Sequence, residues 1–244
     1  MTFNVLVACE ESQAVCTAFR RQGARAFSCD LQECSGGHPE WHIRCDVRQV
    51  IDGECTFNTM DGLVHRVDHW DLIIAHPPCT YLSNAGAKHL WRGHVLNAER
   101  YALGLEGKAL FMACYNAPCA HVCVENPIPS KVYELPRCTQ YVQPYEYGHP
   151  YSKRTCLWLR GLPALVPTDI VAEHVPYITS GSYTKSHDPR YKGTSRAGGA
   201  AKMRSKTFTG IADAMATQWM AFLKDEHEIP HDNNSTHRHD GHEL

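Results

Sequence analysis

The sequence predicts an α/β protein in which a mostly parallel β-sheet is covered by helices on both faces. Short apolar runs suited to buried strands recur along the chain, the clearest being residues 4–8 (NVLVA), 71–75 (DLIIA) and 120–124 (AHVCV). Segments with apolar residues at helical spacing lie between them. Strands that alternate with helices form parallel sheets, because each connection crosses back over one face of the sheet.

Each expected element follows from a local pattern and from the residues that stop it. Ser12 is a candidate N-cap for the first helix and Gly23 ends it, while Pro77 and Pro78 end the strongest strand. The expected strands are residues 4–8, 25–29, 42–45, 71–75, 120–124 and 154–159, and the expected helices are residues 12–22, 95–117 and 209–224.

Length and composition predict a globular protein without a membrane partner. The chain has 244 residues, 43% of them hydrophobic and 20% charged, which is ordinary for a chain with a buried core. No apolar run approaches the ~20 residues that cross a bilayer. The N-terminus, MTFNVLVACEES, lacks the basic start of a secretory signal. We therefore expect a cytoplasmic protein, and nothing in the sequence calls for more than a monomer.

The 12 cysteines are expected to be reduced thiols, most of them small buried hydrophobic residues. No CxxC pair occurs, so a zinc ribbon is not expected. Cys29, Cys34 and Cys45 have loose spacing for a metal site, and the histidines of the polar tail are expected to bind metal only adventitiously. The sequence therefore predicts no metal.

Positive charge gathers in one segment although the net charge is −2. Residues 177–206 carry seven lysines and arginines against one acid, Asp188. A local basic stripe is typical of a polyanion partner, and Lys192, Arg196 and Lys202 are candidates for phosphate contacts. The alternative is a solvated surface loop.

Polar side chains come directly after the predicted strands. Glu10, Asp30, Asp46, Cys79 and Glu125 each follow an apolar run. Parallel sheets bind ligands at the carboxyl ends of their strands, so these side chains predict a site at one sheet edge.

The segment His76-Pro77-Pro78-Cys79 and the pair Glu125-Asn126 carry the predicted chemistry. Two prolines stiffen a turn and hold the following thiol over the sheet edge, which suits a nucleophile. A carboxylate at the same height suits an acid partner. Read singly, the turn is equally consistent with a buried structural thiol, and His76 is expected to be a strand-end residue without a proton role.

Taken in order, IIAHPPC, VCVENP and GHPYSKRTCLWL resemble the DNA cytosine-5 methyltransferases, most closely small phage or prophage members. The resemblance covers roughly residues 4–160 and 204–220. It implies a Rossmann-like, S-adenosylmethionine-dependent methyltransferase fold, in the cytoplasm of a bacterial host or phage-infected cell. The partial match to the family's Gln-x-Arg-x-Arg strand lies at Lys153 and Arg154.

The resemblance also implies roles for individual residues. Cys79 matches the thiol that adds to C6 of the pyrimidine, and Glu125 matches the residue that protonates or hydrogen-bonds N3. Asn126 orders that loop. Arg154 matches the arginine that contacts O2 of the base, with Lys153 beside it on the substrate side.

On the cofactor side, Asp30 matches the acid that binds the ribose hydroxyls and Asp46 the acid that accepts from the adenine N6. Asp213 and Ala214 match the helix that closes the pocket. In the turn before the nucleophile, Pro77 is assigned to the cofactor and Pro78 to the substrate. The remaining candidates for the cofactor are Glu10 and Ser12, in a loop that lacks the family's glycines.

The sequence thus predicts an enzyme that transfers a methyl group from S-adenosylmethionine to C5 of cytosine in DNA. Two alternatives stay open: another covalent C5-pyrimidine modification of DNA or a nucleotide, and a non-catalytic DNA-binding or anti-defence protein on the same fold. The expected division is a catalytic domain of residues 1–176 and 207–224, a basic insertion of residues 177–206 that forms a reduced target-recognition element, and a disordered tail of residues 225–244.

Overall fold

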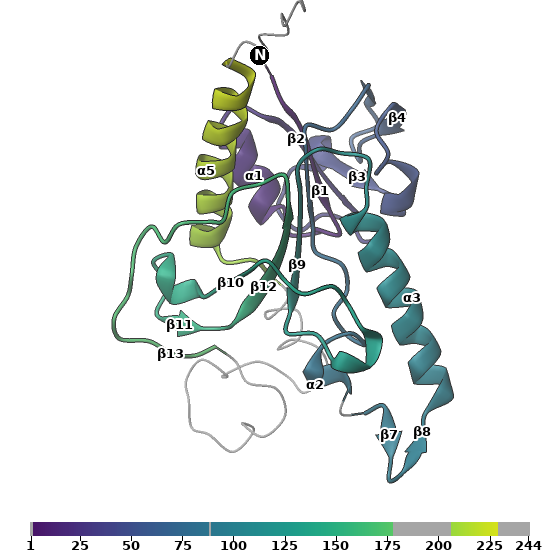
Figure 1. The fold of residues 1–244 in the computed structure, drawn as a ribbon. Coiled ribbons are helices and arrows are strands. Elements are labelled where there is room, and N and C mark those ends of the chain that lie inside the picture. The colour runs from purple at the N-terminus through teal and green to yellow at the C-terminus, as the bar shows by residue number, and fades with distance from the viewer. Residues whose placement is uncertain (1, 88, 178–205, 229–244) are drawn as a thin grey trace, which may run out of the picture.

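The computed structural model describes residues 2–87, 89–177 and 206–228 (Figure 1). Most of the basic segment and the tail from residue 229 lie outside the described residues, and so do Lys192, Arg196 and Lys202. Within the described ranges, a large, mostly parallel sheet lies between helices, which confirms the predicted α/β class.

Seven strands form the central sheet in the order β10-β12-β9-β6-β1-β2-β3. The five strands from β3 to β9 are mutually parallel neighbours, whereas β12 runs antiparallel to both β9 and β10. From β3 to β9 the order follows the doubly wound pattern, whose direction reverses between β1 and β6. The strands are β1 (Asn4–Ala8), β2 (Arg25–Asp30), β3 (His42–Arg44), β6 (Leu72–Ala75), β9 (Val122–Pro127), β10 (Gln140–Val142) and β12 (Thr155–Arg160).

Helices cover both faces, as predicted. Helices α1 (Ala14–Arg21) and α5 (Thr209–Glu228) pack together on one face, and α3 (Ala98–Tyr115) lies on the other (Figure 1). Each face has its own buried apolar cluster, one holding Val5 and Trp219 and the other Phe111 and Trp158. Strands β1 and β6 are apolar on both sides because both of their faces are buried.

Several element boundaries differ from the expectation. The helix expected at 95–117 begins at Ala98, because Asn97 caps it by accepting the amide of Arg100, and residues 95–96 pair in a hairpin instead. The last helix continues to Glu228, four residues into the expected tail. The pattern missed the sheet strand β10 and several short elements outside the central sheet: β4 (Cys55–Asn58), β5 (Val64–Val67), β7 (Trp91–Arg92), β8 (Val95–Leu96), β11 (Tyr151–Ser152), β13 (Val175–Pro176) and α2 (Asn84–Ala87).

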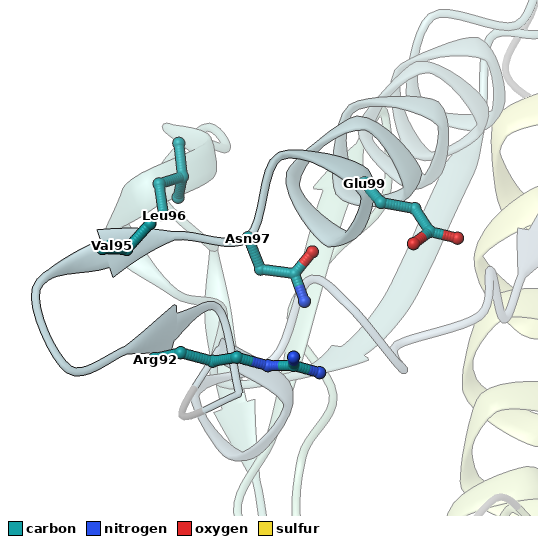
Figure 2. Close-up of a pocket in the computed structure, with 5 residues that line it drawn as sticks. All are labelled: Arg92, Val95, Leu96, Asn97 and Glu99. Carbon is teal, nitrogen blue, oxygen red and sulfur yellow. The ribbon is translucent and has the colours of Figure 1, made fainter.

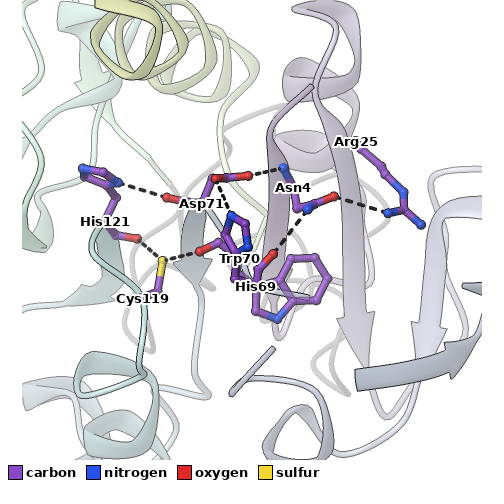
Figure 3. Close-up of polar contacts among 7 residues, drawn as sticks. All are labelled: Asn4, Arg25, His69, Trp70, Asp71, Cys119 and His121. Carbon is purple, nitrogen blue, oxygen red and sulfur yellow. Dashed lines mark hydrogen bonds and ion pairs between the residues drawn. The ribbon is translucent and has the colours of Figure 1, made fainter. Parts of the chain in front are cut away.

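A polar network ties the amino ends of the parallel strands together (Figure 3). Asp71 accepts the backbone amide of Asn4 at 2.6 Å, and the carbonyl of Asp71 accepts from the His121 ring at 3.0 Å. The Cys119 thiol donates to the carbonyls of Trp70 and His121 at 3.1 and 3.2 Å. These bonds connect the starts of β1, β6 and β9, so this edge is engaged in structure.

None of the helices within the described ranges is long and apolar enough to cross a membrane.

We predict that Gly104 is required for packing in α3. A Cβ at this position would collide with the ring and hydroxyl of the buried Tyr133, whereas at Gly107 the nearest atom, Leu82 Cγ, lies 3.5 Å away. Gly104→Ala should therefore lower the free energy of unfolding by about 1–3 kcal/mol. The matched Gly107→Ala should be neutral or stabilising by up to ~1 kcal/mol. Urea unfolding measures both, and equal stabilities would contradict the close approach.

Candidate functional site

The five polar residues predicted at strand ends do come to one edge of the sheet. Glu10, Asp30 and Asp46 follow or end β1, β2 and β3, Cys79 follows β6, and Glu125 lies near the end of β9. Because these strands are parallel neighbours, their carboxyl ends share an edge.

A row of charged side chains crosses this edge on the side of α1 and α5, three of them deeply buried and the fourth, Lys153, half-buried. Nδ1 of His76, after β6, lies 3.1 Å from Oε2 of Glu125, on β9. The two side chains are only 8% and 14% exposed. Glu10 acts electrostatically on His76 from the end of β1, and Lys153 acts on both members of the pair from the start of β12. Negative and positive groups thus alternate across four neighbouring strands.

In the His76–Glu125 pair, the shared proton lies on His76. Burial raises the pKa of Glu125, but the hydrogen bond and charge of His76, together with Lys153, outweigh it and lower the pKa. Burial opposes the charged His76 ring, but Glu125 and then Glu10 outweigh it and raise the pKa of His76. A resting general acid needs a raised pKa, so the expected role of Glu125 as an acid partner does not describe this state. Glu125 is a carboxylate.

Glu10, not Ser12, caps the first helix. The carboxylate of Glu10 accepts the backbone amides of Val15 at 2.7 Å and Cys16 at 3.1 Å. The formal N-cap, Gln13, makes no side-chain cap, and the helix begins at Ala14 rather than at residue 12. Burial raises the pKa of Glu10, and His76 and the helix amides only partly offset this. The carboxylate of Glu10 therefore binds the free backbone amides at the start of α1.

The loop between β1 and α1 takes glycine-type conformations without glycine. Cys9 and Gln13 both have φ of 58°, in the left-handed region. Such conformations cost about 1–3 kcal/mol in non-glycine residues and gather at functional sites. This loop follows β1 at the point where the strand order reverses, which is where doubly wound sheets bind ligands.

The turn that carries Cys79 is tied to the Glu125 strand. The side-chain amide of the buried Asn126 donates to the carbonyl of Pro77 at 2.8 Å. Pro77 is buried, Pro78 is exposed and Cys79 is half-buried. Asn126 therefore holds the turn two residues before the thiol.

Lys153 and Arg154 point to different surroundings. Nζ of Lys153 lies 5.8 Å from the ring centroid of Phe208, next to α5, and Lys153 acts on Glu125. Arg154 is exposed and its guanidinium lies 5.6 Å from the ring centroid of Tyr141 on β10. Of the two expected substrate residues, the geometry therefore brings Lys153 to the Glu125 carboxylate and leaves Arg154 at the rim.

The two expected cofactor acids differ in how they are held. Asp30 is half-buried, and its Oδ1 accepts the amide of Gln32 at 2.9 Å. Asp46 accepts the Arg48 backbone amide at 3.0 Å and forms an ion pair with the Arg48 guanidinium, which lowers the pKa of Asp46. Within the described ranges, Asp30 alone of the two has no charged side-chain partner.

Asp213 and Ala214, the two residues of the last helix that were expected at the cofactor, do not lie at the charged row. Asp213 is exposed and pairs with Arg21 of α1 at 2.7 Å. Ala214 is buried in the apolar cluster between α5, α1 and the sheet. In this structure both residues help to dock α5 against α1.

Unsatisfied polar atoms gather at this edge. Among the described residues, the buried side-chain atoms without a hydrogen-bond partner are Glu11 Oε2, His76 Nε2, Asn126 Oδ1 and Arg160 Nε. The first three follow β1, follow β6 and lie on β9 at the carboxyl edge. Buried polar groups are normally paired, so a cluster of exceptions indicates a place where a ligand or water completes the bonds.

Both ends of the basic segment are held beside Lys153. The rings of Tyr177 and Phe208 lie 4.8 Å apart, and Tyr151 lies 5.1 Å from Tyr177. The amide of Tyr177 donates to the carbonyl of Ser152 at 2.9 Å. The chain therefore leaves and re-enters the described structure at the carboxyl edge.

A pocket lies away from this row, at the β7–β8 hairpin (Figure 2). Its lining residues are Arg92, Val95, Leu96, Asn97 and Glu99, none of which is a predicted site residue. No group of His, Cys, Asp and Glu that could hold a metal occurs among the described residues.

His76 is the member of the charged row whose pairing with Glu125 the sequence did not predict. It follows a buried strand just as Glu10 and Asp30 follow theirs, and that position was the available signal. Its partner stands 49 residues away in the chain, so only the pairing of β6 with β9 reveals it.

Comparisons with known proteins do not assign the chain to a family. No protein-family model matches it, and no curated protein matches it.

Proposed function

We propose that this protein is a DNA cytosine-5 methyltransferase that uses S-adenosylmethionine and a covalent Cys79 adduct. The observation that carries the proposal is the cluster of unsatisfied buried polar atoms around His76 and Asn126, on the strands that bear Cys79 and Glu125. The fold and the order of the motifs favour the same reaction. Cytoplasmic location and a monomeric state belong to the proposal.

Cys79 is the proposed nucleophile. Its sulfur would add to C6 of the target cytosine while the thiol proton passes to N3, which makes C5 electron-rich. C5 would then take up the methyl group, and S-adenosylhomocysteine would leave as the neutral thioether. Release of the C5 proton to solvent, followed by expulsion of the sulfur with return of the N3 proton to it, would restore the aromatic base and the thiol. The bond from Asn126 to the Pro77 carbonyl holds the turn during this cycle. The base has to leave the duplex to reach a half-buried thiol.

Glu125 is the proposed partner of the base. As a carboxylate it accepts hydrogen bonds from the base edge, and these strengthen when the ring gains a proton at N3. The resemblance assigns the O2 contact to Arg154. Because Lys153 acts electrostatically on Glu125, we propose Lys153 as the cation beside Glu125. Arg154, which is exposed and lies beside Tyr141, is the proposed DNA contact.

Residues at the carboxyl ends of β1 and β2 fit the proposed cofactor. The side chain of Asp30 stands about twenty residues after the first loop, the place from which doubly wound proteins hold a ribose. Glu11 Oε2 is a buried acceptor without a hydrogen-bond partner among the described residues, and it suits an ammonium or hydroxyl donor. S-adenosylmethionine supplies an electrophilic methyl group when bound. Glu10 shapes the loop through its cap to α1, and Pro77 and Pro78 separate the two sides of the site.

DNA is the proposed partner because the basic segment begins and ends at this edge. Tyr177 is the last described residue at one end of the segment, and Phe208 follows the other end. The rings of Tyr177 and Phe208 are in contact, and Phe208 lies beside Lys153. Lys192, Arg196 and Lys202 belong to that segment. Cations tethered there attract phosphates to the site.

We predict that wild-type protein forms a covalent complex with DNA that carries 5-fluorocytosine when S-adenosylmethionine is present. Fluorine at C5 cannot leave as a proton does, so the sulfur–C6 bond persists. Cys79→Ser should form none, because a hydroxyl is a far weaker nucleophile than a thiolate at neutral pH. Denaturing gel electrophoresis measures the adduct.

Cys55→Ser is the matched control, since Cys55 is another half-buried thiol, on β4, which pairs with β5 outside the central sheet. It should trap DNA as the wild type does. No trapping by the wild type, or equal trapping by Cys79→Ser, would remove the proposed role. Trapping that does not need S-adenosylmethionine would favour another covalent C5 modification.

We predict that Asp30→Ala weakens S-adenosylmethionine binding by about 10-fold to 100-fold, the loss of one hydrogen bond to a charged group. Asp46→Ala should have a smaller effect, because the Asp46 carboxylate is already bound to Arg48. The exposed Asp52→Ala is the control and should bind normally. Isothermal calorimetry measures all three, and a wild type that binds no S-adenosylmethionine would defeat the proposal.

A further inference from the structure

We propose that His76 is a positioning residue that holds Oε2 of Glu125 in place and presents only Oε1 to the target base. The second half of this inference, that Oε1 of Glu125 contacts the target base, rests on the proposed function. The first half, the orientation of Glu125, stands on the geometry of the pair, and the directions in which the two pKa values shift support it.

The geometry leaves Glu125 one available oxygen. Nδ1 of His76 binds Oε2 at 3.1 Å, and both side chains are held on neighbouring parallel strands. No hydrogen bond to Oε1 from another described residue is found. Nε2 of His76 is buried without a partner among the described residues, so the ring also keeps a donor for a ligand or water.

The charged groups around the pair favour an imidazolium and a carboxylate. Glu10 faces His76 from the end of β1, Glu125 faces it from β9, and Lys153 faces both from the start of β12. Cys123 lies on the same face of β9 as Glu125, and burial raises its pKa well above the usual range, so it stays a neutral thiol. The carboxylates of Glu10 and Glu125 raise the pKa of His76, and only Lys153 among these groups lowers it. The proton of the pair therefore lies on His76.

An ionised Oε1 discriminates between bases. Cytosine offers the N4 amino group, a donor, where thymine offers O4, an acceptor. A carboxylate accepts from the first and is repelled by the second, whereas a protonated Glu125 would tolerate either. His76 therefore acts on base selection through Glu125.

The test measures the titration of Glu125 directly in the full-length protein. Carbon-13 NMR of glutamate side-chain carboxyls, assigned by comparison with Glu125→Gln, gives the Glu125 midpoint. In the wild type it should lie below the ordinary 4.5. In His76→Asn it should rise by about one unit or more, because burial is no longer offset. His121→Asn is the matched control, since it breaks the His121–Glu226 pair at the other side of the fold.

A second measurement follows covalent trapping of 5-fluorocytosine DNA against pH. Loss of His76 should move the acidic limb of the rate profile to higher pH, because less Glu125 is ionised at each pH, whereas His121→Asn should leave the limb in place. A Glu125 midpoint at or above 4.5 in the wild type, or one unchanged in His76→Asn, would overturn the inference. A limb that does not move would overturn the catalytic half of it.

The outcomes separate this inference from the proposed function. A shifted Glu125 midpoint with no trapping by the wild type at any pH supports the positioning half and defeats the methyltransferase. If His76→Asn does not fold, nitrogen-15 NMR of the wild-type imidazole decides. His76 should titrate above its ordinary 6.5, and a lower midpoint would overturn the inference.

Discussion

Parallel pairing of β1 with β2 and β6, and of β6 with β9, is the constraint on which the candidate site depends. Parallel neighbours need crossover connections, so every loop that follows one of these strands emerges at the same edge. That edge collects Glu10, His76, Cys79 and Glu125 from segments more than a hundred residues apart. The antiparallel β12 then brings Lys153 to the same edge by its start rather than its end.

The two edges of the sheet differ in how many buried polar atoms they leave unpaired. At the amino edge, hydrogen bonds from Asp71, His121 and Cys119 link the starts of three strands (Figure 3). Among the described residues, three of the four buried side-chain atoms without a hydrogen-bond partner lie at the carboxyl edge, and the fourth, Arg160 Nε, lies at the amino edge. Unpaired buried atoms cost stability, about 1–3 kcal/mol each, so a cluster of three at one edge favours a ligand site there.

The sequence predicted those strands and helices whose formation depends on residues close together in the chain. Apolar runs such as NVLVA and DLIIA became buried strands because both sheet faces are covered. Elements that depend on distant partners escaped prediction: β10 is three residues long and exists through its pairing with β12. Ser12 looked like a cap, but Glu10 reaches the helix amides because Cys9 and Gln13 turn the loop left-handed. His76 needed Glu125, a contact that no sequence window contains.

The central claim is chemical, that Cys79 and Glu125 modify C5 of cytosine. Mass spectrometry of nucleosides from the DNA of cells that express the protein tests it most directly, with cells that express Cys79→Ala as the reference. We expect 5-methylcytosine in the first sample and only background in the second. DNA with unmodified cytosine in both samples, from cells that contain the folded protein, would contradict the claim.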